Sequence, residues 1–240
     1  TTEREKVFTM SDTYYDTKVV IATTKADKIT KYSQLKGKTV GVKNGTAAQR
    51  FLDKNKDKYG YKIKTFDTGD LMYNSLSAGA VDAVMGDQPV IQYAIQKGQD
   101  LAINMDGEAV GGFAFGVKKG GNHEKLITEF NKALAQMKAD GTLDEICKKY
   151  FSDGEPEAVK SATLDTSKDQ LVVATNAAFE PFEYTKGEDY YGIDMEIAKL
   201  LADELGKELV IENMDFDAVC LSVSQQKCDI AMAGLTINEE

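Results

Sequence analysis

The end of the sequence carries residues that suit anion binding. In CDIAMAGLTINEE, residues 228–240, an apolar run from Ile230 to Ala233 stops at Gly234 and continues through Thr236. Asn238 and the two glutamates after it resemble the first turn of a helix. A strand that breaks at glycine and enters a helix through Thr or Asn exposes backbone N–H groups at one point, and such groups attract anions. We therefore expect an anion site here.

A second stretch has the same organisation. Lys38 to Lys43, KTVGVK, is predicted to be a buried strand that ends in Asn44-Gly45-Thr46, and a helix is predicted from Ala47 to Asn55. The glycine lets a ligand approach the backbone closely, and the helix start again offers N–H groups. Two sites of this kind suggest two lobes that face one another.

The order of the predicted elements gives the fold class. Strands alternate with helices, which is typical of parallel α/β layers. The predicted strands are 7–11, 18–24, 38–43, 61–66, 81–85, 101–105, 112–118, 171–175, 209–213 and 229–233. The predicted helices or helical turns are 33–37, 47–55, 68–77, one from Pro89, 123–139, 143–150, 193–205 and 218–225. Residues 152–167 are rich in charged and small residues without apolar periodicity, and we predict a surface linker there.

Composition narrows the candidate partners. The 240 residues carry a net charge of −10, so nucleic acid and anionic membranes are poor partners. No apolar run approaches the roughly 20 residues of a spanning helix, so direct membrane insertion is not expected. No signal peptide or lipid-attachment cysteine opens the sequence. If the natural protein is exported, we expect such a segment to be removed or to lie outside this sequence.

The three cysteines do not form a disulfide framework, because their number is odd. Cys147 lies in an amphipathic helix pattern and is expected to be a small buried hydrophobe. Cys220 and Cys228 are either two buried thiols or, in an extracellular setting, a disulfide. No histidine accompanies them at metal-ligand spacing, so zinc is not expected, and no cofactor motif is present. His123, at a predicted helix start, is expected at the surface.

The two ends of the sequence resemble one continuous motif. The chain begins TTEREKVFTMSDTYYDT and ends AGLTINEE. Read end to start, these stretches closely resemble the amino-acid-binding bacterial extracellular solute-binding proteins, family 3, the receptors of polar-amino-acid ABC importers. In that family an AG-x-T-I-[TN]-x-ER stretch runs into V-x-F-S-[DE]-x-Y-Y without a break. The rotated order here indicates a circular permutant, or the second half of one copy joined to the first half of the next in a tandem array.

The resemblance implies a two-lobed α/β fold of the type II periplasmic-binding-protein class, circularly permuted, with the ligand in the interlobe cleft. Lobe 1 would comprise residues 1–17, 116–151 and 168–240, and would contain both chain ends. Lobe 2 would comprise residues 23–113. The strands 18–24 and 113–117 would form the hinge. The linker 152–167 would join the former termini.

The resemblance also assigns contacts to the ligand's carboxylate. Arg4 would clamp it, since a guanidinium binds a carboxylate in bidentate fashion. Thr236 would contact it beside Arg4, and Thr46 and Ala47 would add N–H groups from the other lobe. If the family motif is set aside, the alternative interpretation of Arg4 is a solvent-exposed residue on a helix.

The ligand's ammonium and side chain would be held by further residues. Gly234 would offer its carbonyl to the ammonium, and Asp87, in GDQP, matches the family's ammonium-binding aspartate. The alternative for Asp87 is an N-cap of the next helix. In the family, the ligand's side chain is contacted from positions that correspond here to Lys43, Asn176, Phe179 and Phe216. Phe182 is a further aromatic residue that belongs either to the pocket or to the core.

The pocket chemistry favours a neutral polar ligand such as glutamine. Asn176 stands where relatives selective for arginine or lysine tend to place a carboxylate, and a Lys43 that points into the cleft would repel a cationic side chain. If Lys43 instead extends to the surface, a basic amino acid becomes the alternative.

The expected partners are a free L-amino acid and the membrane permease of an ABC importer. The expected location of the protein is extracellular or periplasmic, and the natural protein is expected to be lipid-anchored or fused to another protein. A monomer is expected, with a tandem or swapped arrangement as the alternative. Two other functions stay open. One is a ligand-sensing domain of a receptor or an engineered sensor. The other is a dehydratase-type enzyme, for which Glu180 and Glu183 are the nearby carboxylates, both expected to face solvent.

Overall fold

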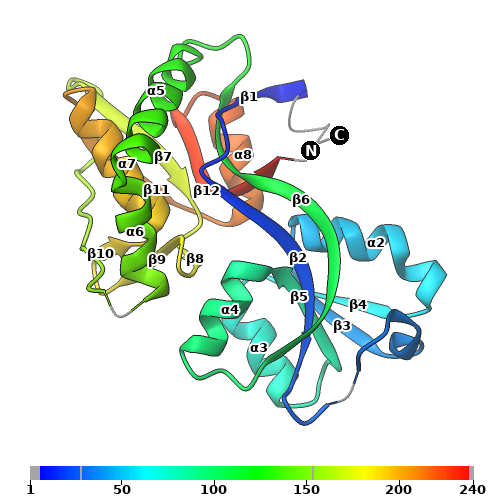
Figure 1. The fold of residues 1–240 in the computed structure, drawn as a ribbon. Helices are drawn as coiled ribbons and strands as arrows, with labels where there is room; N and C mark the ends of the chain where they lie inside the picture. The colour runs from blue at the N-terminus through cyan, green and yellow to red at the C-terminus, as the bar shows by residue number, and fades with distance from the viewer. Residues whose placement is uncertain (1–5, 28, 153, 238–240) are drawn as a thin grey trace. The chain divides into compact units, whose positions relative to one another are not determined.

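The structure, a computed structural model, describes residues 6–27, 29–152 and 154–237. The chain forms two compact units (Figure 1). Unit 1 contains the described residues up to 15 and from 112 onward, and unit 2 contains residues 16–111. The helix turns predicted at 1–4 and 238–240 lie outside the described residues.

Unit 2 is a sheet covered by helices. Its strands follow the order β6-β2-β5-β3-β4, with β3 parallel to β4 and β5, and β2 antiparallel to β5. The strands are β2 (Tyr15–Thr23), β3 (Thr39–Lys43), β4 (Lys62–Phe66), β5 (Ala83–Asp87) and β6 (Ala102–Lys118). The helices are η1 (Tyr32–Leu35), α2 (Ala47–Tyr59), α3 (Gly69–Ser77) and α4 (Gln88–Gln96).

The apolar run in β2 explains why it lies inside this sheet. Val19 and Ile21 pack in one hydrophobic cluster, whereas Val20 and Ala22 pack in another. Alternate side chains of a strand point to opposite faces of the sheet. A continuous apolar sequence is therefore what a strand buried on both faces requires.

Unit 1 contains a larger and a smaller sheet. In the larger one the order is β11-β7-β12-β6, and β1 pairs with β6. Its further strands are β1 (Phe8–Met10), β7 (Gln170–Thr175), β11 (Glu208–Asn213) and β12 (Ile230–Ile237). The small sheet consists of β8 (Ala178–Phe179), β9 (Glu183–Lys186) and β10 (Asp189–Tyr191). The helices are α5 (Lys125–Asp140), α6 (Thr142–Phe151), α7 (Ile193–Glu204) and α8 (Phe216–Ser224).

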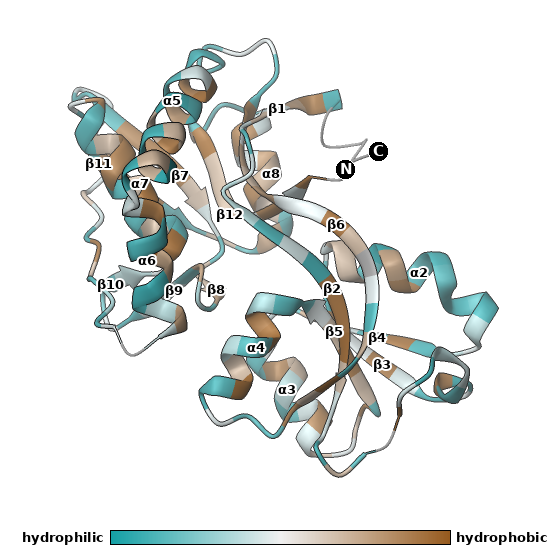
Figure 2. Cartoon of the chain, in the orientation of Figure 1, coloured by the Kyte–Doolittle hydropathy of each residue, from teal (hydrophilic) through white to brown (hydrophobic). Residues whose placement is uncertain are grey.

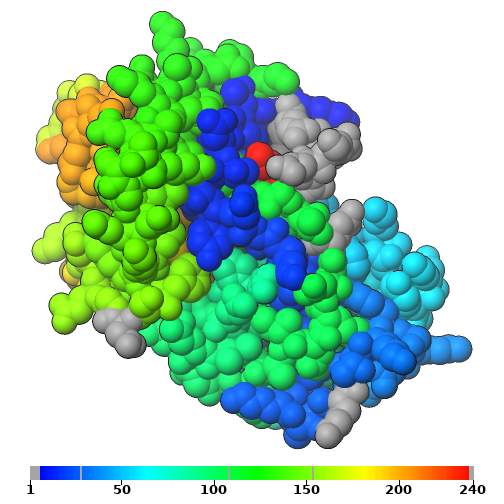
Figure 3. Space-filling view, viewed as in Figure 1, coloured from blue at the N-terminus to red at the C-terminus, as the bar shows by residue number. Residues whose placement is uncertain are grey.

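The helices of unit 1 are amphipathic. Figure 2 shows hydrophobic and hydrophilic residues on different sides of α5, whose buried residues include Phe130 and Leu134. α5 and α6 lie at the surface of unit 1 and cover much of the face seen in Figure 3. Helix α7 ends as its sequence predicts, with Gly206 at φ +67° immediately beyond its C-cap.

The chain passes between the units within two strands, β2 and β6, which lie side by side (Figure 1). The prediction of separate strands at 101–105 and 112–118 was wrong, because β6 is one continuous strand. Its glycines allow close packing rather than a break: a Cβ on Gly112 would stand 2.8 Å from Thr13 and from the Tyr15 carbonyl oxygen.

The last strand also differs from its prediction. β12 continues through Gly234 to Ile237 instead of stopping at the glycine. It lies between β7 and β6: it pairs in parallel with β7 at Ile230 and Ala231, and in antiparallel with β6 at Ala231 and again from Leu235 onward. The register shifts between Ala231 and Leu235, so Gly234 lies in a β-bulge.

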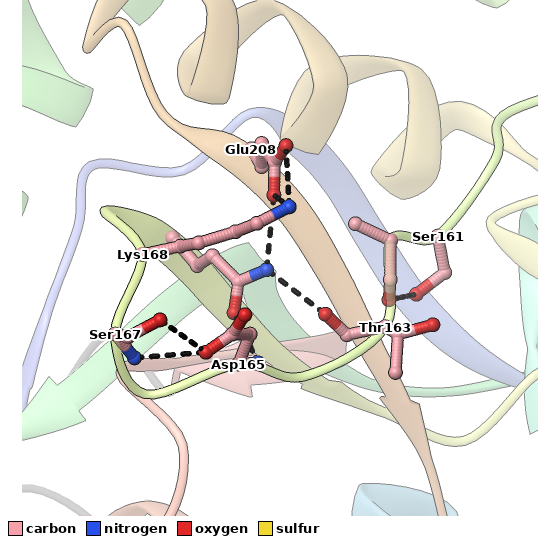
Figure 4. A network of polar contacts seen from close by, with 8 residues as sticks. Ser161, Thr163, Asp165, Ser167, Lys168 and Glu208 are labelled. Carbon is pink, nitrogen blue, oxygen red and sulfur yellow. Dashed lines mark hydrogen bonds and ion pairs between the residues drawn. The ribbon is translucent and has the colours of Figure 1, made fainter.

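The predicted linker is fastened to unit 1. Val159 is buried and forms a β-bridge with Tyr190, and the Ala162 N–H donates to the Leu209 carbonyl at 2.8 Å. Figure 4 shows the following part, where Asp165 accepts hydrogen bonds from Ser167 and Lys168 lies against Glu208. Residues 159–167 of the predicted linker are therefore held against unit 1 by hydrogen bonds and a β-bridge.

The structure also describes the cysteines, His123 and the lengths of the helices. The cysteines have free thiols, with Cys228 buried and the other two half-buried, so Cys220 and Cys228 do not form a disulfide. His123 is partly exposed, and its Nε2 lies 3.1 Å from Asp229 Oδ1. None of the helices in the described ranges combines the length and the hydrophobicity that a membrane span requires.

Candidate functional site

Asp87, the last residue of β5, is the centre of the candidate group in unit 2. It occupies the N-cap position of α4, but its side chain makes no capping hydrogen bond. Asp87 is only 5% exposed, and its Oδ1 atom has no hydrogen-bond partner among the described residues. A buried carboxylate oxygen without a donor is costly, so this oxygen is suited to a donor that arrives from outside.

The charge on Asp87 is set by opposing influences. Burial raises its pKa to about 7, against the lowering effects of its own backbone N–H, Lys43, Thr17 and Arg50. Lys43, at the end of β3, is itself buried rather than extended into solvent. The alternative of a surface Lys43 is therefore wrong for this structure. Arg50 and Thr17 are neighbours of Asp87 that sequence reasoning missed, because nothing in the sequence places them beside β5.

The start of α2 lies next to this carboxylate group. Thr46 is the N-cap, accepting from the Gln49 N–H at 3.3 Å, and its hydroxyl donates to the Lys43 carbonyl at 2.8 Å. Gly45 adopts φ +73°, a conformation that favours glycine. The N–H of Ala47, at the first helical position, has no acceptor within the helix. This geometry fits the predicted role of the helix start as an anion site.

In unit 1 the bulge of β12 forms the second candidate group. Gly234 has φ +54°, and a Cβ there would stand 2.5 Å from Cε1 of Phe179. The Phe179 ring therefore lies directly against the backbone of Gly234. Thr236, two residues further along the strand, is buried and pairs with Phe113. Phe113 in turn contacts the Phe179 ring edge to face at 5.9 Å.

Asn176 and Phe216 lie where β7 and β11 end. The Asn176 Nδ2 atom donates to the Met214 carbonyl at 2.8 Å, so part of its amide serves the local fold. Phe216 is the first residue of α8 and is half-buried beside the hydrophobic cluster of this sheet. Both side chains are thus held by the ends of neighbouring parallel strands, the edge at which open α/β sheets bind ligands.

The remaining sequence assignments differ in outcome. Arg4 lies outside the described residues. Phe182 is fully buried among Tyr15, Phe113 and Phe151, which places it in the core. Glu180 is exposed as expected.

Glu183 is completely buried, and the expectation that it faces solvent was wrong. It belongs to a buried group of titratable residues that sequence reasoning did not find. Asp194, near the start of α7, faces Tyr14 and Glu183, and its Oδ2 accepts the Gly234 N–H at 3.1 Å. Burial raises the pKa of Asp194 to about 7, while contacts with Tyr14, Gly234 and Glu183 lower it. In sequence, Asp194 is an acid in the first turn of a helix, a pattern normally explained by the helix dipole.

Metal ligation has no evident place in the described residues. No three His, Cys, Asp or Glu side chains within them are grouped as a metal site. The candidate residues can bind a ligand by hydrogen bonds from a buried carboxylate, a helix start and a bulged strand, and by packing against aromatic rings.

Comparison with known proteins identifies the family. The sequence model of the bacterial extracellular solute-binding proteins, family 3, matches residues 1–153 and 171–240. The ABC transporter arginine-binding protein 1 of Escherichia coli (strain K12) is 27% identical over 154 residues, covering 63% of this chain and 62% of that protein. The histidine-binding periplasmic protein of Salmonella typhimurium is 32% identical over 161 residues, covering 63% of this chain and 61% of that protein.

A solved structure described as an ancestral arginine-binding protein bound to glutamine is 34% identical, with a TM-score of 0.53, and the match covers 63% of this chain and 67% of that chain. The chain thus spans less than two thirds of the length of the two curated relatives. The predicted type II periplasmic-binding-protein-like fold is confirmed. Because the family's sequence model matches most of its residues, this chain belongs to the bacterial extracellular solute-binding proteins, family 3.

Proposed function

We propose that this chain binds one polar L-amino acid, with glutamine favoured, as the substrate-binding receptor of an ABC importer. Units 1 and 2 would be the two lobes, and the strands β2 and β6 the hinge on which they close. The observation that carries the proposal is Asp87, a buried carboxylate with an unpartnered oxygen that does not cap its own helix. An α-ammonium is the cationic donor that such an oxygen would accept.

The other contacts would follow the same chemistry. The ligand's carboxylate would meet Arg4, Thr236 and the N–H groups of Thr46 and Ala47. The Gly234 carbonyl would share the ammonium with Asp87, and Phe179 and Phe216 would pack against the side chain. Asn176 and Lys43 would line the side-chain pocket. The buried position of Lys43 supports a neutral ligand, because a cationic side chain beside it would add an unpaired buried charge.

A basic amino acid is the second candidate. The two curated relatives are named for arginine and histidine, and the ancestral arginine-binding protein is described in complex with glutamine. Names within this family therefore favour a basic ligand as strongly as a neutral one. Lys43 is the local feature that weighs against a basic ligand.

A dehydratase activity has little support in the residues. Glu183 faces Asp194 inside unit 1, and a carboxyl in that position is not available to a substrate. We propose a role outside the cytoplasmic membrane with a permease as the partner, in line with the periplasmic name of the histidine-binding relative and the extracellular name of the family. We also propose that the natural protein is either lipid-anchored or fused to a permease or a sensor.

The rotated order of the segments is also proposed here. The family's sequence model matches two separate segments of this chain, 1–153 and 171–240. Each pairwise alignment, by contrast, covers only 63% of the chain. This difference supports a rotated order, because one collinear alignment can follow only one of the two segments. A gene in which residues 168–240 precede residues 1–151 should express a protein that binds the same amino acid at least as tightly. Loss of binding in that protein would contradict the rotation.

The test is isothermal titration with each of the twenty amino acids, after unfolding and refolding to remove bound ligand. Saturable binding of L-glutamine near one per chain would support the proposal. Tighter binding of L-arginine or L-lysine would keep the receptor class and overturn the neutral pocket. A folded chain that binds none of the twenty would reject the proposed function.

A further inference from the structure

The bulge at Gly234 leaves a backbone group that the sheet does not hold. The pairing of β12 with β7 ends at Ala231, and its pairing with β6 shifts register between Ala231 and Leu235. Gly234 at φ +54° turns its N–H away from the regular ladder. That N–H donates instead to Oδ2 of Asp194 at 3.1 Å, in a fully buried setting.

Asp194 is held firmly for this contact. It is completely buried at the second position of α7, and its own N–H donates to the Phe182 carbonyl at 2.9 Å. The preceding N–H, from Ile193, donates to the Pro181 carbonyl at 3.1 Å. The start of α7, which holds the Asp194 carboxylate against β12, is therefore fixed by two backbone hydrogen bonds to the segment before β9.

The contact fixes one of the two peptide planes that together set the direction of the Gly234 carbonyl. Glycine has no Cβ, so its two flanking peptide planes rotate freely unless each is fixed by a neighbour. Asp194 fixes the plane before Gly234, and pairing of Leu235 with Ala114 fixes the chain after it. The Phe179 ring closes the side where a Cβ would stand.

We propose that Asp194 is a positioning residue for amino-acid binding. It holds the peptide before Gly234, while the pairing of Leu235 holds the peptide that carries the Gly234 carbonyl, and the two contacts together direct that carbonyl at the ligand's ammonium. The inference rests on the proposed function, in which that carbonyl is an ammonium acceptor. Asp194 itself does not touch the ligand; it acts through the peptide at Gly234.

The groups around Asp194 support a fixed carboxyl rather than a mobile one. Tyr14 and Glu183 face it from the segment after β1 and from β9, and Cys147 faces it from α6. The Tyr14 hydroxyl and Asp194 Oδ1 are buried without a well-aligned hydrogen bond among the described residues. A proton shared between the two carboxyls would supply a donor, so the cluster holds together best when one carboxyl is neutral.

The same helix supplies a matched control. Glu196 is also buried and lies two residues further along α7, but its carboxylate bonds to Tyr150 and Lys149 and not to β12. Glu196→Gln removes a buried carboxylate at comparable cost to the fold. It leaves the hydrogen bond between Asp194 and Gly234 in place.

The experiment compares Asp194→Ala, Asp194→Asn and Glu196→Gln with the parent chain, using L-glutamine and L-arginine as probes. Calorimetry gives the Kd, stopped-flow fluorescence gives the dissociation rate, and circular dichroism checks the fold. Asp194→Ala should weaken the Kd at least tenfold through faster dissociation. Asp194→Asn should stay within about threefold of the parent, because its amide oxygen still accepts the Gly234 N–H. Glu196→Gln should lower the melting temperature and leave the Kd unchanged.

The outcomes separate this inference from the proposed function. If the parent chain binds neither these probes nor any other amino acid, the proposed function fails first. If the parent binds and a folded Asp194→Ala binds equally well, the positioning role is overturned. An equal loss in Glu196→Gln also overturns it, since that result indicates general loosening. Should Asp194→Ala not fold, Asp194→Ser takes its place, because a serine hydroxyl is too short to reach Gly234.

Discussion

Each unit of this protein buries an aspartate whose pKa is raised to about 7, and the surroundings of the two carboxyls are opposite. Asp87 in unit 2 faces the cations Lys43 and Arg50 and keeps one oxygen without a donor. Asp194 in unit 1 faces Tyr14 and Glu183, and one of its oxygens accepts a backbone N–H, while its Oδ1, like that of Asp87, has no hydrogen-bond partner among the described residues. Similar burial therefore serves two purposes. One carboxyl is arranged to become an anion when a cation arrives, and the other to stay in place inside the fold.

The largest expected effect comes from removing the carboxyl of Asp87. Asp87→Ala should weaken amino-acid binding by about 2–5 kcal/mol, because it leaves a buried ammonium without its charged partner. Titration calorimetry with L-glutamine measures the loss. Asp82→Ala is the matched control, since Asp82 just precedes the same strand and pairs with Lys38 and the Thr39 N–H. Equal losses in the two variants would remove the distinction between a ligand carboxyl and a structural one.

The second effect concerns stability against pH in the ligand-free chain. The pKa of Asp194 is raised in the folded state, so its contribution to the free energy of unfolding is fully present below about pH 4. It is lost as the pH rises to about 7, at up to about 1.4 kcal/mol per pH unit. Asp194→Asn cannot ionise, so its stability should fall less over that range. Denaturant titrations at pH 4, 5, 6 and 7 measure the difference.

Asp87→Asn sharpens this measurement. Its stability should also fall less between pH 4 and 7 while no ligand is present, because Asp87 has the same direction of shift. With saturating ligand the Asp87 difference should shrink, whereas the Asp194 difference should remain. If both differences respond to ligand in the same way, the two aspartates do not have separate roles.

The third effect is the pH dependence of binding. An ammonium beside Asp87 favours the ionised carboxyl, so the pKa of Asp87 should fall in the complex and binding should release a proton. The Kd should then weaken by about fivefold between pH 7 and pH 6, or about 1 kcal/mol, and approach tenfold per pH unit below that. Calorimetry at pH 6, 7 and 8 tests this. Asp87→Asn should give a flat profile and Asp194→Asn should keep the slope, although both residues titrate near the same pH.

Much of the fold follows from local sequence, and the exceptions share a physical cause. The helix from Ile193 was predicted because apolar spacing and Gly206 are local signals. β12 was predicted to stop at Gly234, because a glycine taken alone marks an end, whereas continuation of the strand through the glycine depends on pairing with β6, which lies far away in sequence. The single strand β6 was missed for the same reason at its glycines.

The candidate residues divide along the same line. Lys43, Asp87 and Gly234 were assigned from the resemblance to the family, and their contacts to a ligand stay predictions. The structure places Lys43 and Asp87 at the ends of strands, where α/β folds bind ligands. Asp194 and Glu183 were not found, because complete burial of an acid is set by tertiary packing and leaves no mark in the local pattern. Glu183 was expected to face solvent, yet it is completely buried.

The smallest expected effect tests the cationic side of the comparison. Lys43 is buried near Asp87, so Lys43→Met should relieve repulsion of a basic side chain and raise the affinity for L-arginine relative to L-glutamine. We expect about 1 kcal/mol, a fivefold change in preference. Lys38→Met removes the same charge just before the same strand, where Lys38 pairs with Asp82, and should leave the preference unchanged. If Lys43→Met weakens both ligands equally, Lys43 serves Asp87 as a counterion and does not select the ligand, and the argument for a neutral pocket then falls with it.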